Sequence, residues 1–469
     1  MRKRIINAAP WALVPVVIIL VILYCLLSGG EKDFERIDIE NFSVEGKYFR
    51  VDERLRKIFL KKRHLPAAHE ETGSPAPDRA EKEASKKKKD EIWLNDLPTI
   101  NGYPLYISGK KMVKIVPGMT GEVGFYTYLF FDNFQKEAKI QFMFEINRDG
   151  KSLKIDHITA ARSSHPYFQH LTLEKNDILV FKFKGNGIAF FSKPIVYKKN
   201  PVEKRKNIFL IAVDTLRWDQ VGAVVGGKPL TPHIDAFTRD CLIFDNAYAQ
   251  CSWTLPSFMS LFTGLYEFNH KVDIARALDP GIPTLTEKAA EKFITFGFHS
   301  GMGMRKRWGY SRGFDYYKRV PYTTPLFPKA GQSLFRSALR LLEEANFPDF
   351  FFFLHTYQVH DPYTPPLEFL LKLNENPAYK RLDVVNQNAP WKTFLPVEDD
   401  LRKSLEELYR AEIHAFDSYF GEFVEKLKEW GLYDNAMIVF MADHGEEFYE
   451  HQGWAHSHSL YNELIKVPL

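Results

Sequence analysis

The sequence is poor in cysteine and carries little net charge. Its 469 residues include three cysteines, and the formal net charge is +4 at pH 7. Cys25 lies in an apolar N-terminal run, so only Cys241 and Cys251 remain to form a disulfide, and their spacing cannot establish its geometry. The cysteines therefore leave the redox compartment open. A nucleic-acid-binding domain would carry a basic patch or stripe, so the small net charge argues against a nucleic-acid partner.

An uncharged apolar segment near the N-terminus is the clearest sign of cellular location. Trp11–Ser28 is long enough to cross a bilayer as a helix, and it follows the basic residues Arg2–Arg4. Clustered positive charge favours the cytoplasmic side. Residues 1–30 are therefore expected to form a cytoplasmic stub and a single transmembrane anchor in the inner (plasma) membrane, with the rest of the chain extracytoplasmic. A cleaved signal peptide is the alternative, although no clear small-x-small cleavage site follows the apolar run.

Two segments of different character come next. Residues 31–91 are expected to be a partly disordered linker, because 64–91 has almost no large apolar side chains to offset the entropy of ordering. Residues 92–200 contain alternating runs such as Lys139–Asn147 and turn residues such as Gly185–Gly187. These favour antiparallel strands and a β-sandwich-like domain. No catalytic constellation is recognisable in that domain.

Residues 201–469 have the pattern of an α/β domain. Continuous apolar runs of strand length occur at Ile208–Val213, Phe350–Leu354 and Ala436–Met441. Helical stretches such as Ser333–Asn346 and Leu401–Trp430 separate them. Strands that are apolar on both faces and alternate with helices predict a parallel sheet flanked by helices. In open sheets of this kind, ligands bind at the carboxyl ends of the strands.

Acidic and imidazole side chains follow each of these strands. They are Asp214 after the first, His355 and His360 after the second, and Asp443, His444, His456 and His458 after the third. A lone Asp after a strand usually forms a turn or caps a helix. Three such groups at one edge of one sheet are instead expected to lie together. Carboxylate with imidazole suits Zn²⁺, Mn²⁺ or a similar divalent ion.

Thr254 stands at the start of an expected helix between the first two strands. Its ordinary role would be an N-cap, with Pro256 in the first turn. The same position supports chemistry, because a hydroxyl at a helix N-terminus feels the positive end of the dipole, which favours an alkoxide and an anionic substrate. A nearby metal ion would activate the hydroxyl further, so Thr254 is a candidate nucleophile.

A series of short motifs runs in order through residues 207–469. They are Asn207–Gly222, Thr231–Asp235, Phe244–Tyr248, Pro256–Ser257, Leu261–Tyr266, Gly313–Asp315, His360–Tyr363, Asp443–Gly445, Leu460–Glu463 and Val467–Leu469. Together they resemble the sulfatase family of the alkaline phosphatase superfamily. The resemblance implies an alkaline-phosphatase-like parallel sheet and a metal-dependent hydrolase or transferase. In that family the chain normally continues into a C-terminal subdomain, so the catalytic domain is expected to be truncated here.

Three positions depart from the family's pattern. Its sulfatases carry Cys or Ser, oxidised to formylglycine, in a C/S-x-P-x-R motif, whereas this sequence has Thr254 and, in place of the arginine, Phe258. Threonine cannot yield formylglycine, so a hydrated-aldehyde mechanism is not expected. Thr254 instead resembles the nucleophile of phosphoethanolamine and lipoteichoic-acid-type transferases and threonine-dependent phosphodiesterases, which favours phosphodiester or phosphoethanolamine-type chemistry. Thr215 stands where many sulfatases have a second Asp ligand.

The resemblance also implies roles for individual residues. Four side chains would bind a divalent ion (Mn, Zn, Mg or Ca): Asp214, Thr254, Asp443 and His444. Thr254 would attack phosphorus or sulfur. His360 and His458 would hold the oxygens of the transferring group or serve the leaving group, with His456 as a rival for His458. Arg305 is a candidate for binding the anionic substrate, and a solvated basic stretch is the alternative.

These features predict metal-dependent hydrolysis or transfer of a phosphate- or sulfate-ester group through a covalent Thr254 intermediate, outside the cytoplasm. The partners would be an anionic ester, with lipid- or glycan-linked compounds as one class, and the membrane through the N-terminal helix. A catalytically inactive envelope protein that binds glycan or lipid on the same fold is the alternative. The intact set of Asp214, Thr254, Asp443 and His444 argues against that alternative.

Overall fold

The computed structural model describes a large part of the chain. The described residues are 34–36, 42–44, 99–100, 102–117, 119–133, 139–160, 162–192, 194–198, 206–301, 303–320, 330–345, 347–374 and 399–469. The predicted anchor and the segment 64–91 lie outside them. Among the described residues, no helix is both long and apolar enough to cross a membrane. The predicted anchor therefore stays a prediction.

The chain divides into two compact units. One contains Glu31–Asn200 and Leu341–Pro348, and the other contains Pro201–Arg340 and Asp349–Leu469. The first unit is built from antiparallel strands, which are β1 (Phe34–Arg36), β2 (Phe42–Val44), β4 (Gly102–Ile115), β5 (Gly121–Asn133), β6 (Ile140–Arg148), β7 (Lys151–Ala160), β8 (Arg162–Leu173), β9 (Ile178–Ser192) and β10 (Ile195–Lys198).

Strand β9 joins the parts of this first unit. One side of it pairs with β4 along its length, and the other side pairs first with β6 and then with β5. The antiparallel strands expected here are present, but they form one connected sheet rather than two separate ones. Alternating side chains of β6 and β9 fill the core, where the rings of Phe144 and Phe181 stack with centroids 4.7 Å apart. Phe347 lies outside that core cluster and contacts Tyr126, Phe168 and Tyr197.

The second unit contains the predicted parallel sheet. Its strands are β11 (Asn207–Val213), β14 (Ile294–His299), β15 (Tyr316–Arg319), β16 (Phe350–Thr356) and β17 (Ala436–Ala442). They lie in the spatial order β17, β11, β16, β14, β15, and each pairs with its neighbour in parallel. The three strands expected from apolar runs are confirmed. Strand β14 was not expected from the sequence, although all six of its residues are buried.

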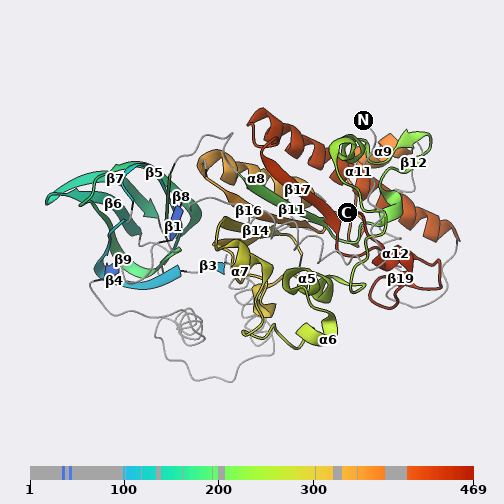
Figure 1. Cartoon of the computed structure of the whole chain (residues 1–469), viewed down its shortest axis with the longest axis horizontal. Coiled ribbons are helices and arrows are strands. Elements are labelled where there is room, and N and C mark those ends of the chain that lie inside the picture. The colour runs from blue at the N-terminus through green and yellow to red at the C-terminus, as the bar shows by residue number, and fades with distance from the viewer. Residues whose placement is uncertain are drawn as a thin grey trace, which may run out of the picture. The chain divides into compact units, whose positions relative to one another are not determined.

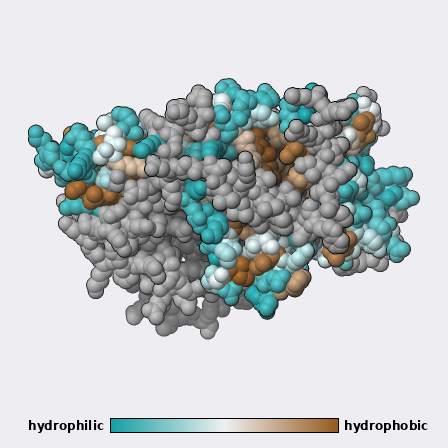
Figure 2. Space-filling view, viewed as in Figure 1, coloured by the Kyte–Doolittle hydropathy of each residue, from teal (hydrophilic) through white to brown (hydrophobic). Residues whose placement is uncertain are grey.

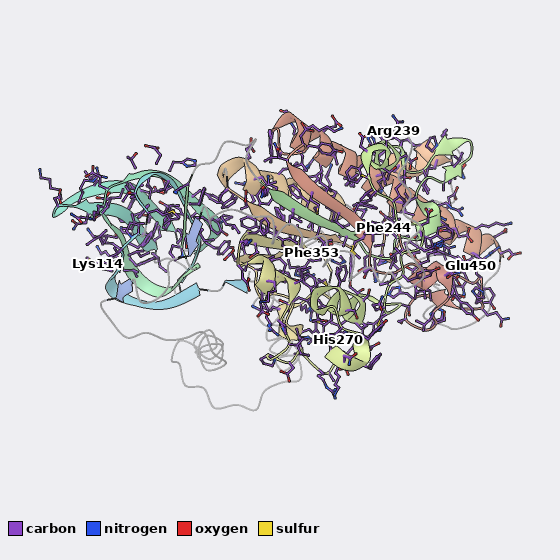
Figure 3. All side chains as sticks on the ribbon, viewed as in Figure 1. Lys114, Arg239, Phe244, His270, Phe353 and Glu450 are labelled. Carbon is purple, nitrogen blue, oxygen red and sulfur yellow. The ribbon has the colours of Figure 1, made fainter. Side chains whose placement is uncertain are left out.

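Helices cover both faces of this sheet (Figure 1). Helices α8 (Ala330–Ala345) and α11 (Asp399–Glu429) lie on one side, where Phe423 of α11 packs edge-on against Phe209 of β11. Helix α5 (Thr254–Thr263) lies on the other side, where Phe258 and Phe262 contact Phe353 of β16 (Figure 3). The two long helices expected from the sequence are thus confirmed, and the continuous apolar strands follow from burial on both faces.

Charged side chains and a glycine define the two ends of helix α11. Asp399 and Asp400 occupy its first turn, and Lys426 and Lys428 occupy its last, so charges of opposite sign complement the helix dipole. Gly431 then adopts a positive φ of 66°, which ends the helix. On the face drawn in Figure 2, the hydrophobic areas of the described residues are separated by hydrophilic ones. Phe268 and Ile274 are among the exposed apolar side chains. Scattered apolar side chains of this kind are normal on a protein surface.

Short elements complete the described part of the chain. The helices are α4 (Pro232–Phe237), α6 (Glu267–His270), α7 (Leu285–Ala289), α9 (Leu367–Leu373) and α12 (Asn462–Ile465). The strands are β3 (Thr99–Ile100), β12 (Val224–Val225), β13 (Lys228–Pro229), β18 (Glu447–Phe448) and β19 (Trp454–Ala455). Strands β18 and β19 form a hairpin directly after the end of β17, so they hold the segment that carries the C-terminal histidines.

Candidate active site

The carboxyl ends of neighbouring strands bring the predicted polar residues together. Asp214 follows β11, and Asp443 and His444 follow β17, which pairs with β11. Thr254 is the first residue of α5, and its Oγ1 lies 3.2 Å from Oδ2 of Asp214 and 3.5 Å from Nε2 of His444. The His444 nitrogen lies 3.4 Å from Oδ2 of Asp443. Four side chains predicted to bind metal thus converge at one buried place.

Thr254 does not cap its helix. Trp253 is the N-cap residue of α5 and makes no side-chain capping bond, while Thr254 is already helical. The expectation that Thr254 is the N-cap is therefore wrong by one residue. Because its hydroxyl is not used for capping, Oγ1 turns toward Asp214 at the positive end of the helix. The hydroxyl of Tyr357 lies 3.4 Å away on another side.

Unsatisfied oxygen atoms mark the centre of this cluster. Oδ1 of Asp214 and both carboxylate oxygens of Asp443 are buried and have no hydrogen-bond partner among the described residues. Leaving such atoms unpaired inside a protein is costly, unless a cation binds them. Asp214, His355 and Asp443 also offer ligand atoms that all lie within 4.8 Å of one another. The donor set of carboxylate and imidazole fits a divalent metal ion.

Burial and neighbouring charges shift the pKa values of this cluster. Burial and the negative charge of Asp214 raise the pKa of Asp443 well above its usual range. Burial opposes ionisation of Asp214 as well, but its bond to His355 and the charges of His444 and His360 hold its pKa below the usual range. Burial lowers the pKa of His444 to about 3, which leaves a neutral imidazole. Its Nδ1 lies 2.9 Å from the Gly445 carbonyl oxygen, so Nε2 remains for a ligand.

His360 lies beside this centre. Its ring stacks on Tyr357 with centroids 4.5 Å apart, and its Nδ1 lies 3.0 Å from Oδ1 of Asp361. Burial alone would lower the pKa of His360, but the bond to Asp361 and the charges of Asp214, Asp361 and Glu446 raise it to about 10. A raised pKa favours the protonated ring, which would suit an anionic ligand. Substrate binding by His360 stays a prediction.

The structure separates His456 from His458. The His456 ring lies 4.5 Å from that of His444 and 5.1 Å from that of His360, and its Nδ1 lies 2.8 Å from Oε1 of the buried Glu446. His458 instead uses Nε2 to contact Glu447 at 2.8 Å and is partly exposed. Of the described contacts, none joins His458 to the cluster. The sequence preferred His458, whereas His456 is the residue that the structure brings to the site.

A glycine-containing loop closes the site beside the nucleophile. A Cβ atom on Gly303 would lie 3.0 Å from Cγ2 and 3.1 Å from Cβ of Thr254, and one on Gly301 would overlap the Tyr357 ring. Only glycine lets the backbone approach this closely. Arg305 follows two residues later and is half-buried. Its predicted contact with substrate stays a prediction.

Several residues of the site were not assigned to it from the sequence. His355 was noted after its strand, but it lies inside β16, with Nε2 3.0 Å from Asp214. Tyr357 and Glu446 were overlooked because each is one polar residue beside a stronger motif. Glu446 also accepts a 2.8 Å bond from the Tyr363 hydroxyl, so two motifs expected from the resemblance meet there.

Comparison with known proteins places this α/β unit in a class. The sulfatase family model matches residues 206–469, more than half of the chain, and the protein therefore belongs to the sulfatase family. Iduronate 2-sulfatase of Mus musculus is 25% identical over 327 residues, covering 56% of this chain and 58% of its own. The low-salt glycan biosynthesis sulfotransferase Agl7 of Haloferax volcanii is 25% identical over 272 residues, covering 56% of this chain and 53% of its own.

A third relative is named for a different activity. The lipoteichoic acid synthase-like YvgJ of Bacillus subtilis is 24% identical over 276 residues, covering 55% of this chain and 39% of its own. The chain thus spans about half the length of these curated relatives or less. The chain is thus similar to a sulfatase, a sulfotransferase and a lipoteichoic acid synthase-like protein.

Proposed function

We propose that the protein cleaves or transfers a phosphate- or sulfate-ester group through a covalent intermediate on Thr254. The observation that carries this proposal is the position of the Thr254 hydroxyl. It stands at the N-terminus of α5, 3.2 Å from Asp214 and free of any capping bond. The helix dipole favours an anion there, and a metal ion held by the cluster would favour it further.

The reaction divides into two displacements. In the first, Oγ1 of Thr254 gives its proton to the Asp214 carboxylate and bonds to phosphorus or sulfur. The bond from that atom to the leaving oxygen breaks, and the leaving oxygen keeps the electron pair and takes a proton. In the second, water or an alcohol gives its proton to His456 and attacks the same atom, the bond to Oγ1 breaks, and Oγ1 regains its proton from Asp214. Water gives hydrolysis and an alcohol gives transfer.

A divalent metal ion is the cofactor that the site fits. Asp214, Asp443, His444 and Thr254 would hold it, and when bound it would supply positive charge next to the nucleophile and the transferring group. The chain's own histidines do the remaining work. His360 binds a non-bridging oxygen of the ester. His456, whose Nδ1 is held by Glu446 at 2.8 Å, uses Nε2 to give the leaving oxygen its proton.

The nucleophile bears on which ester is preferred. Threonine cannot form the formylglycine of the family's sulfatases, and Phe258 replaces the arginine of their motif. We therefore favour a phosphodiester or a phosphoethanolamine-type substrate over a sulfate ester. The apolar segment Trp11–Ser28 supports an anchored protein whose catalytic unit lies outside the cytoplasm.

Turnover of aryl phosphodiesters, phosphomonoesters and sulfate esters by variants of the full chain tests this proposal. Thr254→Ala should lower kcat at least about 1,000-fold, because it removes the nucleophile, while Thr254→Ser should keep measurable activity. Thr263→Ala is the matched control, since that hydroxyl lies at the other end of α5 and bonds to the Met259 carbonyl. Undiminished activity in Thr254→Ala would exclude a covalent role. A wild-type protein that is metal-free and inactive would favour a binding protein instead.

A further inference from the structure

His355 occupies a buried place directly behind the nucleophile. It lies within β16 and is fully buried, and its Nε2 is 3.0 Å from Oδ2 of Asp214. Oδ2 also accepts the bond from Thr254, whereas Oδ1 of Asp214 has no hydrogen-bond partner among the described residues. One oxygen of this carboxylate is therefore held by the protein, and the other is left for a cation.

The surroundings of the His355 ring fix its orientation. The Phe258 ring meets it edge-on with centroids 4.8 Å apart, and the Phe353 ring lies nearly parallel to it. On a third side, a Cβ atom on Gly301 would come within 2.8 Å of its Cε1. Phe258 is also the residue that replaces the arginine of the C/S-x-P-x-R motif. Here an aromatic ring packs on an imidazole, and the imidazole makes the polar contact with Asp214.

We propose that His355 is a positioning residue of the metal centre, which donates its Nε2 proton to Oδ2 of Asp214 and so turns Oδ1 toward the metal ion. This role rests on the proposed metal centre and adds a residue to it. Hydrogen-bonded partners behind metal ligands orient those ligands and strengthen binding. In this chain the partner comes from β16, the strand beside β11, rather than from the nucleophile helix.

Comparison with His444 argues that His355 is not itself a ligand. A histidine that binds metal usually donates its other ring N–H to a backbone carbonyl or a carboxylate. His444 meets that condition, since its Nδ1 lies 2.9 Å from the Gly445 carbonyl oxygen. Nδ1 of His355 is buried and lacks a partner among the described residues. Binding metal through Nε2 would leave an unpaired N–H there, whereas donating Nε2–H to Asp214 leaves only an unused lone pair.

Cobalt binding by the metal-free full chain tests this role without measuring activity. The Co²⁺ dissociation constant should rise about 10- to 100-fold in His355→Ala, the usual loss when such a partner is removed. His355→Gln should bind more tightly than His355→Ala, because its side-chain amide can still donate to Asp214. His270→Ala is the control, since His270 is an equally buried histidine of the same unit that contacts Ser260 at 3.1 Å (Figure 3).

The visible spectrum of the cobalt-saturated protein separates a partner from a ligand. His355→Ala at saturation should keep the wild-type spectrum, because no ligand is lost. Equal Co²⁺ affinity in His355→Ala and wild type would overturn the inference, and so would a saturated spectrum that has lost a nitrogen ligand. Equal losses in the Ala and Gln variants would contradict the donor role. If the wild-type chain bound no Co²⁺, the proposed metal centre itself would fail.

Discussion

An uncharged glycine backbone and two polar side chains hold Thr254 in place. Its methyl group and Cβ face Gly303. The backbone can approach this closely because glycine has no side chain. On its other sides lie Asp214 and the Tyr357 hydroxyl. The reactivity of the hydroxyl therefore depends on its exact direction as well as on the metal site, because displacement of a nucleophile by one ångström is enough to slow a reaction strongly.

Gly303→Ala tests that dependence. The added methyl group would push on the Thr254 side chain, so kcat should fall by as much as about 100-fold. Metal should still bind, since the atoms nearest to a Cβ on Gly303 belong to Thr254 and Tyr357, and the other proposed ligands are unchanged. Gly281→Ala is a suitable control, because that glycine is exposed and its only near neighbour is the carboxylate of Asp279. Wild-type kcat in Gly303→Ala would mean that the loop does not hold the nucleophile.

The residues of the site differ in how far the sequence could predict them. Asp214, Asp443 and His444 were predictable, because each directly follows an apolar strand. His355 was harder to assign, since an imidazole inside a buried strand can face either side of a sheet. The choice between His456 and His458 could not be made, because both lie in one irregular segment, and the partners Glu446 and Glu447 that separate them are adjacent in sequence.

At the scale of elements, α11 contributes a buried acid to the segment after β16. Glu412 accepts hydrogen bonds from the Gln358 side chain at 2.5 Å and from the Thr364 backbone N–H at 2.9 Å. Burial raises the pKa of Glu412 to about 8, and these two bonds only partly offset it. The sequence predicted this helix but not the contact, because a helical period does not say which loop a buried side chain will meet.

Glu412 makes stability depend on pH. Its pKa in the folded chain is about 8, above the ordinary value of 4.5. Folding therefore favours the protonated form of Glu412. The resulting contribution to the free energy of unfolding is complete below about pH 4.5 and is lost as the pH rises through about 8. Between these limits it lowers the free energy of unfolding by at most about 1.4 kcal/mol per pH unit.

Glu412→Gln should remove that slope, because the amide keeps the shape and does not titrate. Chemical unfolding of both proteins at about pH 5, 6.5 and 8 measures how the free energy of unfolding depends on pH. The free energy of unfolding of the variant should increase relative to that of wild type as the pH rises. Glu422→Gln, an exposed position on the same helix, should follow the wild-type curve. Parallel curves for wild type and Glu412→Gln would rule out titration of this residue.

For the whole molecule, the parallel sheet and its helices were predictable and the strand pairing of the N-terminal unit was not. Continuous apolar runs such as Ile208–Val213 admit few other arrangements once helices alternate with them. In the other unit, alternation predicted antiparallel strands, but it could not reveal that β9 pairs with β6 and β5 on the same side. Long-range pairing of that kind is not encoded in a local period.

Metal binding should stabilise the whole protein, since the centre joins residues that follow β11 and β17. At a free metal concentration of 100 times the dissociation constant, binding to the folded chain alone adds about 2.7 kcal/mol. Tm should therefore rise when Mn²⁺ or Zn²⁺ is added to metal-free wild type and should not rise in Asp443→Asn. Asp434→Asn is the control, because Asp434 is exposed just before β17. An equal rise in both variants would place the metal elsewhere.

The most direct test of the central claim is the intact mass of the full chain after rapid quenching with an aryl phosphodiester or an aryl sulfate. We expect a mass increase equal to the transferred group, located on Thr254 by fragmentation and absent from Thr254→Ala. Turnover by wild type without any adduct on Thr254, together with undiminished turnover by Thr254→Ala, would contradict it.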